Sequence, residues 1–322
     1  SNSIKIIEEY TFRGCSGFSV SLNIPDSITL IKDYAFFGCS GFNSSLTIPN
    51  SVTSIGKFAF SRCSGLTGSL TIPDSITAIG DYAFSECFGF NDSLKIGNSL
   101  KIICTNTFNK CNKFKKLDIG NSVETIEPNA FKDFSHITGD LVIPDSVKKI
   151  GDFAFNGCSS LNGSLIIGNS LKTIGSYTFS GCKNFKKHLI LGKNIKVIEK
   201  ESFKNFSKFI SELKIPNSVT FIGEEAFSGC YGFSKLTLSN SLTEINHHVF
   251  SGCSGLRNEL LIPKSVVNIG EYAFYGCKRL IGSLIIHDSI ESIGDFAFND
   301  CSSLVELTIP SSVTSIGKHA FY

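Results

Sequence analysis

The chain has 322 residues, of which 42% are hydrophobic and 18% are charged, and its formal net charge is +2. This composition supplies enough apolar material for a buried core and excludes a disordered chain. The small net charge argues against a general polyanion-binding surface, so nucleic acid is not expected as a partner, although lysines are concentrated between residues 183 and 214. No apolar run approaches the ~20 residues that a membrane span needs, so no membrane insertion is expected within this segment.

A single motif recurs along the whole chain. "LTIPNSVTSIGKFAFSRC" at residues 46–63 returns almost unchanged as "LTIPDSITAIGDYAFSEC" at 70–87. The phenylalanine of its Ala-Phe pair is spaced by 24 residues ten times and by 23 residues three times. A fixed period of this length predicts stacked units, each stable only through its neighbours. These phenylalanines are Phe12, Phe36, Phe60, Phe84, Phe108, Phe131, Phe155, Phe179, Phe203, Phe227, Phe250, Phe274, Phe298 and Phe321.

Each repeat predicts the same elements in the same order. Leu70-x-Ile72 alternates with period two before a proline, which is typical of a very short strand closed by a turn. A second short extended segment is expected next. Ile79, Ala83, Phe84 and Cys87 then follow at the spacing of one helical face, which predicts a helical turn. The glycine of the "IG" pair is attributed to its backbone freedom in a turn.

At these residues the chain resembles the BspA-like (Treponema-type) leucine-rich repeats, whose unit reads roughly C-x-x-L-x-x-L-x-I-P-x-S-V-x-x-I-G-x-x-A-F. The resemblance covers essentially the whole chain. It implies an α/β solenoid, a right-handed leucine-rich-repeat coil of about 13 repeats, with a parallel β-sheet on one face and short helical turns on the other. The repeat departs from the motif where Thr11, Thr107, Thr178, Ser202 and Val249 replace the alanine, and where Phe134 and Phe206 replace the cysteine.

Residues 1–322 are therefore expected to form a single solenoid. The chain starts and stops within a repeat, and neither end resembles the polar cap that seals a solenoid. We expect this segment to be a piece of a longer array.

The twelve cysteines invite a metal or redox interpretation, but eleven of them lie three residues after a repeat phenylalanine. No C-x2-C pair occurs, whereas zinc sites need such pairs or nearby histidines. We expect a buried column of free, inert thiols and no metal, with Cys104 outside the column. Unpaired thiols are unusual in exported proteins, which usually pair their cysteines. A buried thiol is not readily oxidised, so free thiols remain compatible with export.

No catalytic arrangement is found. The six histidines occupy unrelated positions of the repeat, and no nucleophile elbow or phosphate-binding loop occurs. We therefore expect no enzyme activity and no cofactor. Four glycosylation sequons occur, for which the abundance of Asn and Ser in the turns is the simpler explanation; they begin at Asn43, Asn91, Asn162 and Asn205.

The variable outward positions are the candidate binding surface. The position between the strand leucine and isoleucine is apolar in three successive repeats, at Val142, Ile166 and Ile190, and again at Leu261 and Ile285. A lysine-rich segment follows, and from it we select Lys186, Lys187, His188 and Lys214 as further binding residues. An apolar stripe beside a basic patch would steer and hold an acidic protein. The alternatives are that β-branched residues simply suit strands, and that the lysines keep the solenoid in solution.

The leading hypothesis is a non-enzymatic protein-binding module. The resemblance implies a cell-surface or secreted protein that adheres to host proteins or to proteins of neighbouring cells. A second hypothesis is a structural protein whose coils stack end to end, through homotypic contacts, into a fibre or coat. A third is an intracellular interaction scaffold, which the unpaired thiols favour.

Overall fold

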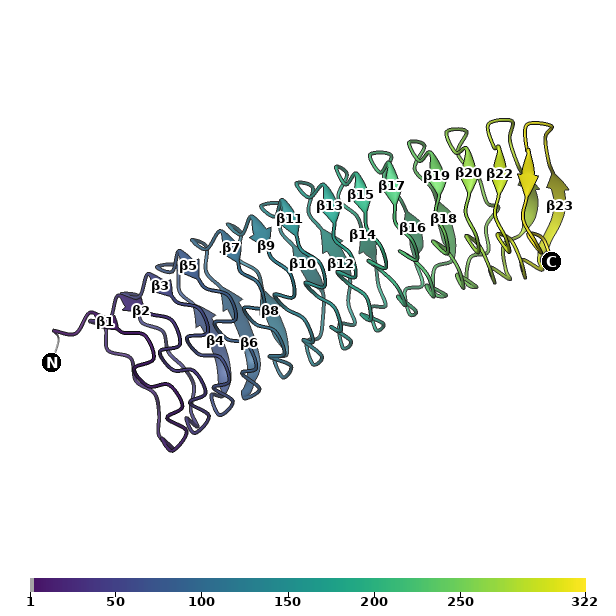
Figure 1. The fold of residues 1–322 in the computed structure, drawn as a ribbon. Coiled ribbons are helices and arrows are strands. Elements are labelled where there is room, and N and C mark those ends of the chain that lie inside the picture. The colour runs from purple at the N-terminus through teal and green to yellow at the C-terminus, as the bar shows by residue number, and fades with distance from the viewer. Residues whose placement is uncertain (1–2) are drawn as a thin grey trace. The chain divides into compact units, whose positions relative to one another are not determined.

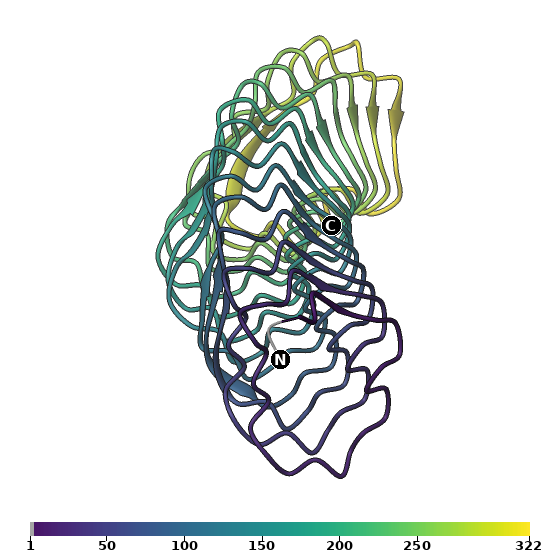
Figure 2. The ribbon, with the colours of Figure 1, turned by 90° about the vertical axis from the view of Figure 1, so that its left-hand side faces the viewer.

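The computed structural model describes residues 3–322 and divides the chain into two compact units, residues 1–161 (unit 1) and 162–322 (unit 2). Each unit is a stack of coils in which the chain advances by one layer per repeat (Figure 1). Viewed along the stack of coils, the strands and turns of successive coils within a unit follow one another in the same order (Figure 2). Each unit is thus a parallel solenoid, as the repeat predicts.

Every strand is short. Those at the Leu-x-Ile segment form what we call the first-strand sheets, which comprise β4 (Gly68–Ile72), β6 (Phe90–Ile96), β8 (Lys116–Asp118) and β10 (Leu141–Ile143) in unit 1, and β12 (Leu165–Ile167), β14 (Leu189–Ile190), β16 (Glu212–Lys214), β18 (Lys235–Thr237), β21 (Gly282–Ile285) and β23 (Leu304–Thr308) in unit 2.

The second extended segment forms two-residue strands, and we call their sheets the second-strand sheets. They comprise β1 (Ile6–Ile7), β2 (Leu30–Ile31), β3 (Ser54–Ile55), β5 (Ala78–Ile79), β7 (Ile102–Ile103), β9 (Thr125–Ile126) and β11 (Lys149–Ile150) in unit 1, and β13 (Thr173–Ile174), β15 (Val197–Ile198), β17 (Phe221–Ile222), β19 (Glu244–Ile245), β20 (Asn268–Ile269), β22 (Ser292–Ile293) and β24 (Ser315–Ile316) in unit 2.

Strands pair parallel and in register. Leu70 of β4 lies opposite Leu94 of β6, and Ile55 of β3 lies opposite Ile79 of β5. Partners are therefore separated by one repeat, so each residue stacks on its counterpart in the next coil. Each strand residue consequently lies about 4.8 Å from the residue at the same repeat position in the neighbouring coil.

Stacked aromatic rings fill the core. Phe36, Phe60 and Phe84 are buried, and their ring centroids are 5.1 and 5.2 Å apart. The same column in unit 2 runs through Phe203 and Phe227, again 5.1 Å apart. Parallel rings offset in this way gain both buried area and favourable ring contacts.

The expected helical turns are wrong. No helix occurs among the residues that the structure describes. Around Phe36, the residues two before and two after, Tyr34 and Gly38, both have positive φ (56° and 71°), which interrupts a right-handed helix. The turn residues instead alternate their hydrogen bonds: the Phe36 N–H donates to Ala59 O in the next coil (2.7 Å), whereas the Phe37 N–H donates to Tyr34 O within its own turn (3.1 Å). An α-helix would direct all of these N–H groups along its own axis, so it could not tie neighbouring coils together.

The explanation given for the "IG" glycine is also wrong. Gly80 is not among the glycines with positive φ. A Cβ at this position would lie 2.5 Å from the backbone nitrogen of Lys57 in the preceding coil. Close approach of two backbones, rather than conformational freedom, requires glycine here.

Non-glycine residues with positive φ form an outer ladder of rings. The position two before the repeat phenylalanine is occupied by Tyr10, Tyr34, Phe58 and Tyr82 in the first four coils, and their rings stack at 5.0, 4.8 and 4.6 Å. In unit 2 the rings of His248 and Tyr272 stack at 4.6 Å in the same way. Left-handed backbone costs about 1–2 kcal/mol per residue, and ring stacking offsets it.

The cysteine column is confirmed as buried. All twelve thiols are free, and only Cys15 and Cys104 are partly exposed. Most column thiols donate to a backbone carbonyl; for example, Cys63 Sγ donates to Phe36 O and Cys87 Sγ donates to Phe60 O, both at 3.0 Å. Burial raises the pKa of Cys253 to about 12. These thiols are therefore small buried groups that link each coil to the carbonyl of the preceding one.

The outer ring ladder predicts an unusual order of stability at Phe58. Phe58→Ala loses two stacked contacts, worth about 0.5–1.5 kcal/mol each, and keeps the strained backbone. Phe58→Gly loses the same contacts but relieves that strain. We expect the wild type to be the most stable, Phe58→Gly to be less stable and Phe58→Ala to be the least stable. The free energies of unfolding of the two variants, measured in urea, should differ by about 1 kcal/mol. An alanine variant as stable as the glycine variant would contradict the ladder.

The buried thiols predict a loss of stability at alkaline pH. The pKa of Cys253 is higher in the folded chain than the ~8.5 of an unfolded thiol, so its contribution is complete below about pH 8.5 and is lost as the pH rises toward 12. Each such thiol lowers the free energy of unfolding by about 1.4 kcal/mol per pH unit in this window. In reducing buffer, Cys253→Ala should show a shallower decline from pH 9 to 11 than the wild type; parallel curves would refute this.

Candidate binding surface

The predicted apolar residues lie on the outward side of the first-strand sheets. Val142 and Ile190 are 52% and 50% exposed, and Ile166 is half-buried. Ile166 on β12 and Ile190 on β14 are direct partners in register within unit 2. Val142 occupies the same outward position on β10 in unit 1. The structure therefore joins Ile166 and Ile190 into one apolar contact surface.

The predicted basic residues flank this pair. Lys186, Lys187 and His188 are exposed just before β14. The backbone N–H groups of Lys186 and Lys187 donate to Gly163 O at 3.3 and 3.2 Å, and the preceding coil's Leu165 N–H donates to His188 O at 2.8 Å. The two lysines thus border both strands. Lys214 is exposed on β16, where it pairs with Thr237 on β18.

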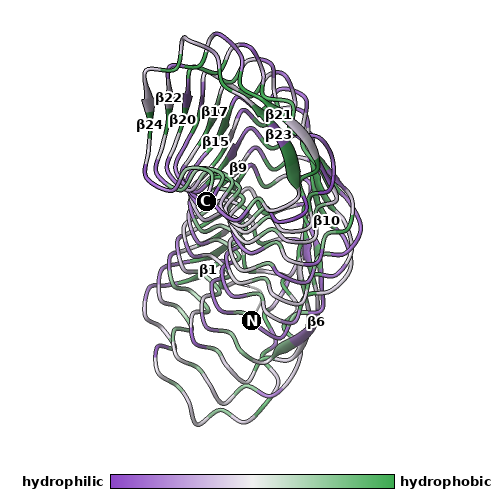
Figure 3. Cartoon of the chain, turned by 90° about the vertical axis from the view of Figure 1, so that its right-hand side faces the viewer, coloured by the Kyte–Doolittle hydropathy of each residue, from purple (hydrophilic) through white to green (hydrophobic). Residues whose placement is uncertain are grey.

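A second apolar surface is larger than the sequence suggested. Leu261 and Ile285 are 72% and 54% exposed, as expected. Ile281 and Val305, seven residues after their repeat phenylalanines, are also exposed, by 50% and 78%. β21, which carries Ile285, and β23, which carries Val305, are parallel neighbours (Figure 3). Ile281 and Val305 lie outside the strand position from which the sequence predicts the apolar stripe, and aligning the repeats at the position after the core Leu or Phe identifies them.

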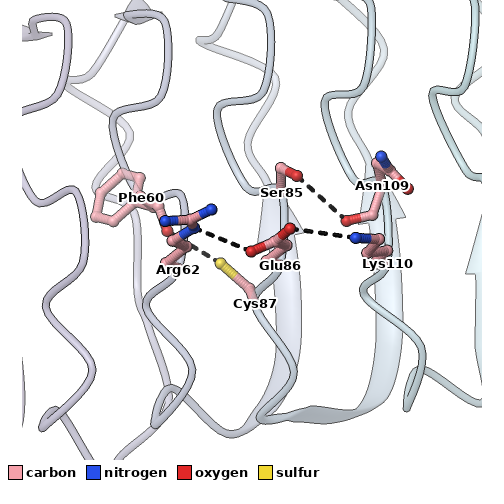
Figure 4. A network of polar contacts seen from close by, with 7 residues as sticks. All are labelled: Phe60, Arg62, Ser85, Glu86, Cys87, Asn109 and Lys110. Atoms are coloured by element: carbon pink, nitrogen blue, oxygen red, sulfur yellow. Dashed lines mark hydrogen bonds and ion pairs between the residues drawn. The ribbon is translucent and has the colours of Figure 1, made fainter.

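Charged residues at equivalent positions of neighbouring coils form bridges. The Glu86 carboxylate lies between Arg62 Nε (3.0 Å) and Lys110 Nζ (3.3 Å), one coil away on either side (Figure 4). Glu124 lies in the same way between Lys148 and Lys101, at 2.6 and 3.5 Å, and Lys148 lowers the pKa of Glu124. A charge in one coil is thus commonly matched by the opposite charge in the next.

The first coils of unit 2 break this pattern. Residues 162–198 contain no aspartate or glutamate. They carry six lysines, which are Lys172, Lys183, Lys186, Lys187, Lys193 and Lys196. The basic character expected for residues 183–214 therefore begins earlier in the chain and is strongest where carboxylates are missing altogether.

The part of the chain that the structure describes holds no group of three or more His, Cys, Asp or Glu side chains that could bind a metal ion. A groove of about 510 Å³ on the second-strand sheet of unit 2 is lined by polar groups, including Glu244, His247, Glu271 and Asp295. His247 Nδ1 there accepts the Glu271 backbone N–H at 3.1 Å. Among the same residues there is no helix long and apolar enough to cross a bilayer.

Comparison with known proteins agrees with the repeat. The family model described as "BspA type Leucine rich repeat region (6 copies)" matches residues 1–87, 42–162, 137–257 and 222–322. No curated protein matches.

Solved structures of bacterial leucine-rich-repeat proteins are similar in fold. A protein from Bacteroides ovatus is 25% identical with a TM-score of 0.67, and the match covers 99% of this chain and 80% of that one. A leucine-rich cell surface protein from Faecalibacterium prausnitzii is 25% identical with a TM-score of 0.53, covering 96% and 84%. A protein from Eubacterium ventriosum is 20% identical with a TM-score of 0.51, covering 92% and 82%.

Proposed function

Because the chain belongs to the BspA-type leucine-rich-repeat family, we propose that it is the protein-binding part of a cell-surface or secreted protein that adheres to host proteins or to proteins of neighbouring cells. Leucine-rich-repeat proteins are in general interaction modules, and no enzymatic family is indicated for this chain. Beyond this general role, we propose which surface of the chain binds, which residues form that surface and which class of protein it binds.

The observation that carries the proposal is the outward apolar pair formed by the half-buried Ile166 and the exposed Ile190. The two side chains are repeat partners on adjacent strands, and Ile190 remains 50% exposed. Neighbouring coils can bury such residues only on the inward side, so an outward apolar pair contributes nothing to the solenoid core. Contiguous exposed apolar surface is typical of an interaction site.

The partner that fits this surface carries acidic groups around an apolar centre. Lys186 and Lys187 border the apolar pair. Lysines at the rim of an interface accelerate association with an acidic partner, whereas the apolar centre resists dissociation. Lys214 extends the proposed surface along the first-strand sheets of unit 2, and Val142 has the equivalent outward position in unit 1.

A location outside the cell is supported by two observations. The Faecalibacterium prausnitzii protein of similar fold is described as a cell surface protein. The free thiols of this chain are buried, and burial raises the pKa of several of them, including Cys87 and Cys230. A buried, protonated thiol reacts slowly with oxidants, so unpaired cysteines are compatible with an oxidising compartment.

The double variant Ile166→Asp with Lys187→Glu tests the surface. Both side chains lie outside the core, so the fold should survive, while binding to protein fractions from host cells or neighbouring cells should weaken at least tenfold. Thr71→Asp, at the same outward strand position in unit 1, is the matched control and should bind as the wild type does. Binding would be measured on immobilised protein, with sedimentation to exclude self-assembly into rods. Unchanged binding of the double variant would remove the proposed surface.

A further inference from the structure

One ion bridge in unit 1 shows how the chain neutralises stacked lysines. Lys101, Glu124 and Lys148 occupy the same position of three successive coils, seven residues before the repeat phenylalanine. The Glu124 carboxylate contacts both lysines, at 3.5 and 2.6 Å. The middle coil thus supplies an anion to the coil on either side.

The same position in unit 2 has no such anion. Lys172 and Lys196 occupy it in adjacent coils, and the Lys196 N–H donates to Lys172 O at 2.8 Å, so their backbones are in direct contact. Both side chains are exposed. Neither forms any of the ion pairs found among residues 3–322, and Glu199, three residues after Lys196, forms no ion pair with either lysine. Two like charges stacked this closely are unfavourable unless an anion from outside lies between them.

A third lysine and several amides complete this edge. Lys193 lies on the turn before Lys196, and its N–H donates to Asn169 Oδ1 at 3.1 Å. Asn194 Nδ2 donates to Asn169 O at 3.0 Å. Lys193, Asn194 and Asn169 are all exposed. We call Lys172, Lys193 and Lys196 the basic edge; its turn residues are polar, which fits a hydroxylated ligand better than the apolar hot spot of a protein partner.

The aromatic residue Phe221 adjoins the basic edge. The Phe221 N–H donates to Lys196 O at 3.3 Å, and the Phe221 side chain is 36% exposed on β17. One ring of this kind can support the apolar face of one sugar. A nucleic-acid strand is held by successive aromatic rings on which successive bases stack, and β15 next to β17 offers Val197 instead.

From these contacts we propose that the basic edge binds a linear acidic polysaccharide, whose carboxylate or sulfate groups take between Lys172 and Lys196 the place that Glu124 has between Lys101 and Lys148. Phe221 packs against a sugar ring of the same polymer. A polymer fits better than a small anion, because Lys193 on the turn needs a further negative charge on the same ligand.

This site is separate from the proposed protein-binding surface. None of the basic-edge lysines belongs to the set of Ile166, Ile190, Lys186 and Lys187. The polysaccharide site can therefore fail while the protein-binding surface holds, and the reverse is equally possible.

The test measures binding of the whole chain to alginate, to dextran sulfate and to neutral dextran at several salt concentrations. Wild type should bind the two acidic polymers and not neutral dextran, and its affinity should fall with salt as counterions compete. The triple variant Lys172→Gln, Lys193→Gln and Lys196→Gln should lose about tenfold in affinity, or ~1.4 kcal/mol, and show a weaker salt dependence. Lys278→Gln is the matched control, because Lys278 is exposed in the same unit but paired with Asp300 at 2.9 Å, and it should bind as the wild type does.

Phe221→Ala separates sugar recognition from charge attraction. It should weaken alginate binding without changing the salt dependence, and it should leave binding of inorganic polyphosphate unchanged, since that polymer has no sugar ring. The proposal is overturned if the triple variant binds alginate as tightly as the wild type does. It is also overturned if Phe221→Ala leaves alginate binding unchanged or if duplex DNA binds as tightly as alginate, because the basic edge would then recognise charge alone.

Discussion

Contact between identical positions of successive coils is the constraint on which the rest of the structure depends. Strands in register place every residue beside its own repeat counterpart, as with Ile55 and Ile79. Half of the turn N–H groups, such as that of Phe36, are committed to the next coil. A side chain is therefore acceptable only if it can pack on the residue at the same position of the neighbouring coil. Flat aromatic rings, small thiols and β-branched residues satisfy this condition, which explains the composition of the core.

The same constraint assigns function to the outward positions. A substituted side chain that points inward must pack against both neighbouring coils, whereas one that points outward needs only to be compatible with solvent. Charges are the intermediate case, because a lysine placed on a lysine is unfavourable and a lysine placed on a glutamate is favourable. The Arg62, Glu86 and Lys110 bridge follows this logic. Positions that ignore it, such as the exposed Ile190 and the stacked Lys172 and Lys196, are those where the scaffold itself gains nothing.

Much of this could be predicted from the sequence, because a repeat reports the same environment many times. The period located the parallel strands, the phenylalanine column and the buried cysteines. The helical turn was wrong for a physical reason: Ile79, Ala83, Phe84 and Cys87 have the spacing of a helical face, but a series of turns with positive φ at Tyr82 and Glu86 presents the same side chains inward. Apolar spacing records which side chains are buried and does not record where the N–H groups point. The "IG" glycine was misread similarly, since its cause is the backbone of another coil.

The binding surface was less predictable because it depends on exceptions to the repeat. The outward strand position selected Ile166 and Ile190, which are partners on adjacent strands, whereas Ile281 and Val305 lie at a position whose direction only the structure shows. To predict the basic edge from the sequence, one must also know which lysines are paired with a carboxylate. Counting lysines alone does not separate Lys200, which is paired with Glu224 at 2.9 Å, from Lys196, which lies four residues earlier and has no such partner. The two lysines differ in whether the neighbouring coil supplies a carboxylate to pair with them. In a solenoid, a lysine whose neighbouring coil supplies no carboxylate is a specific reason to look for an anionic ligand.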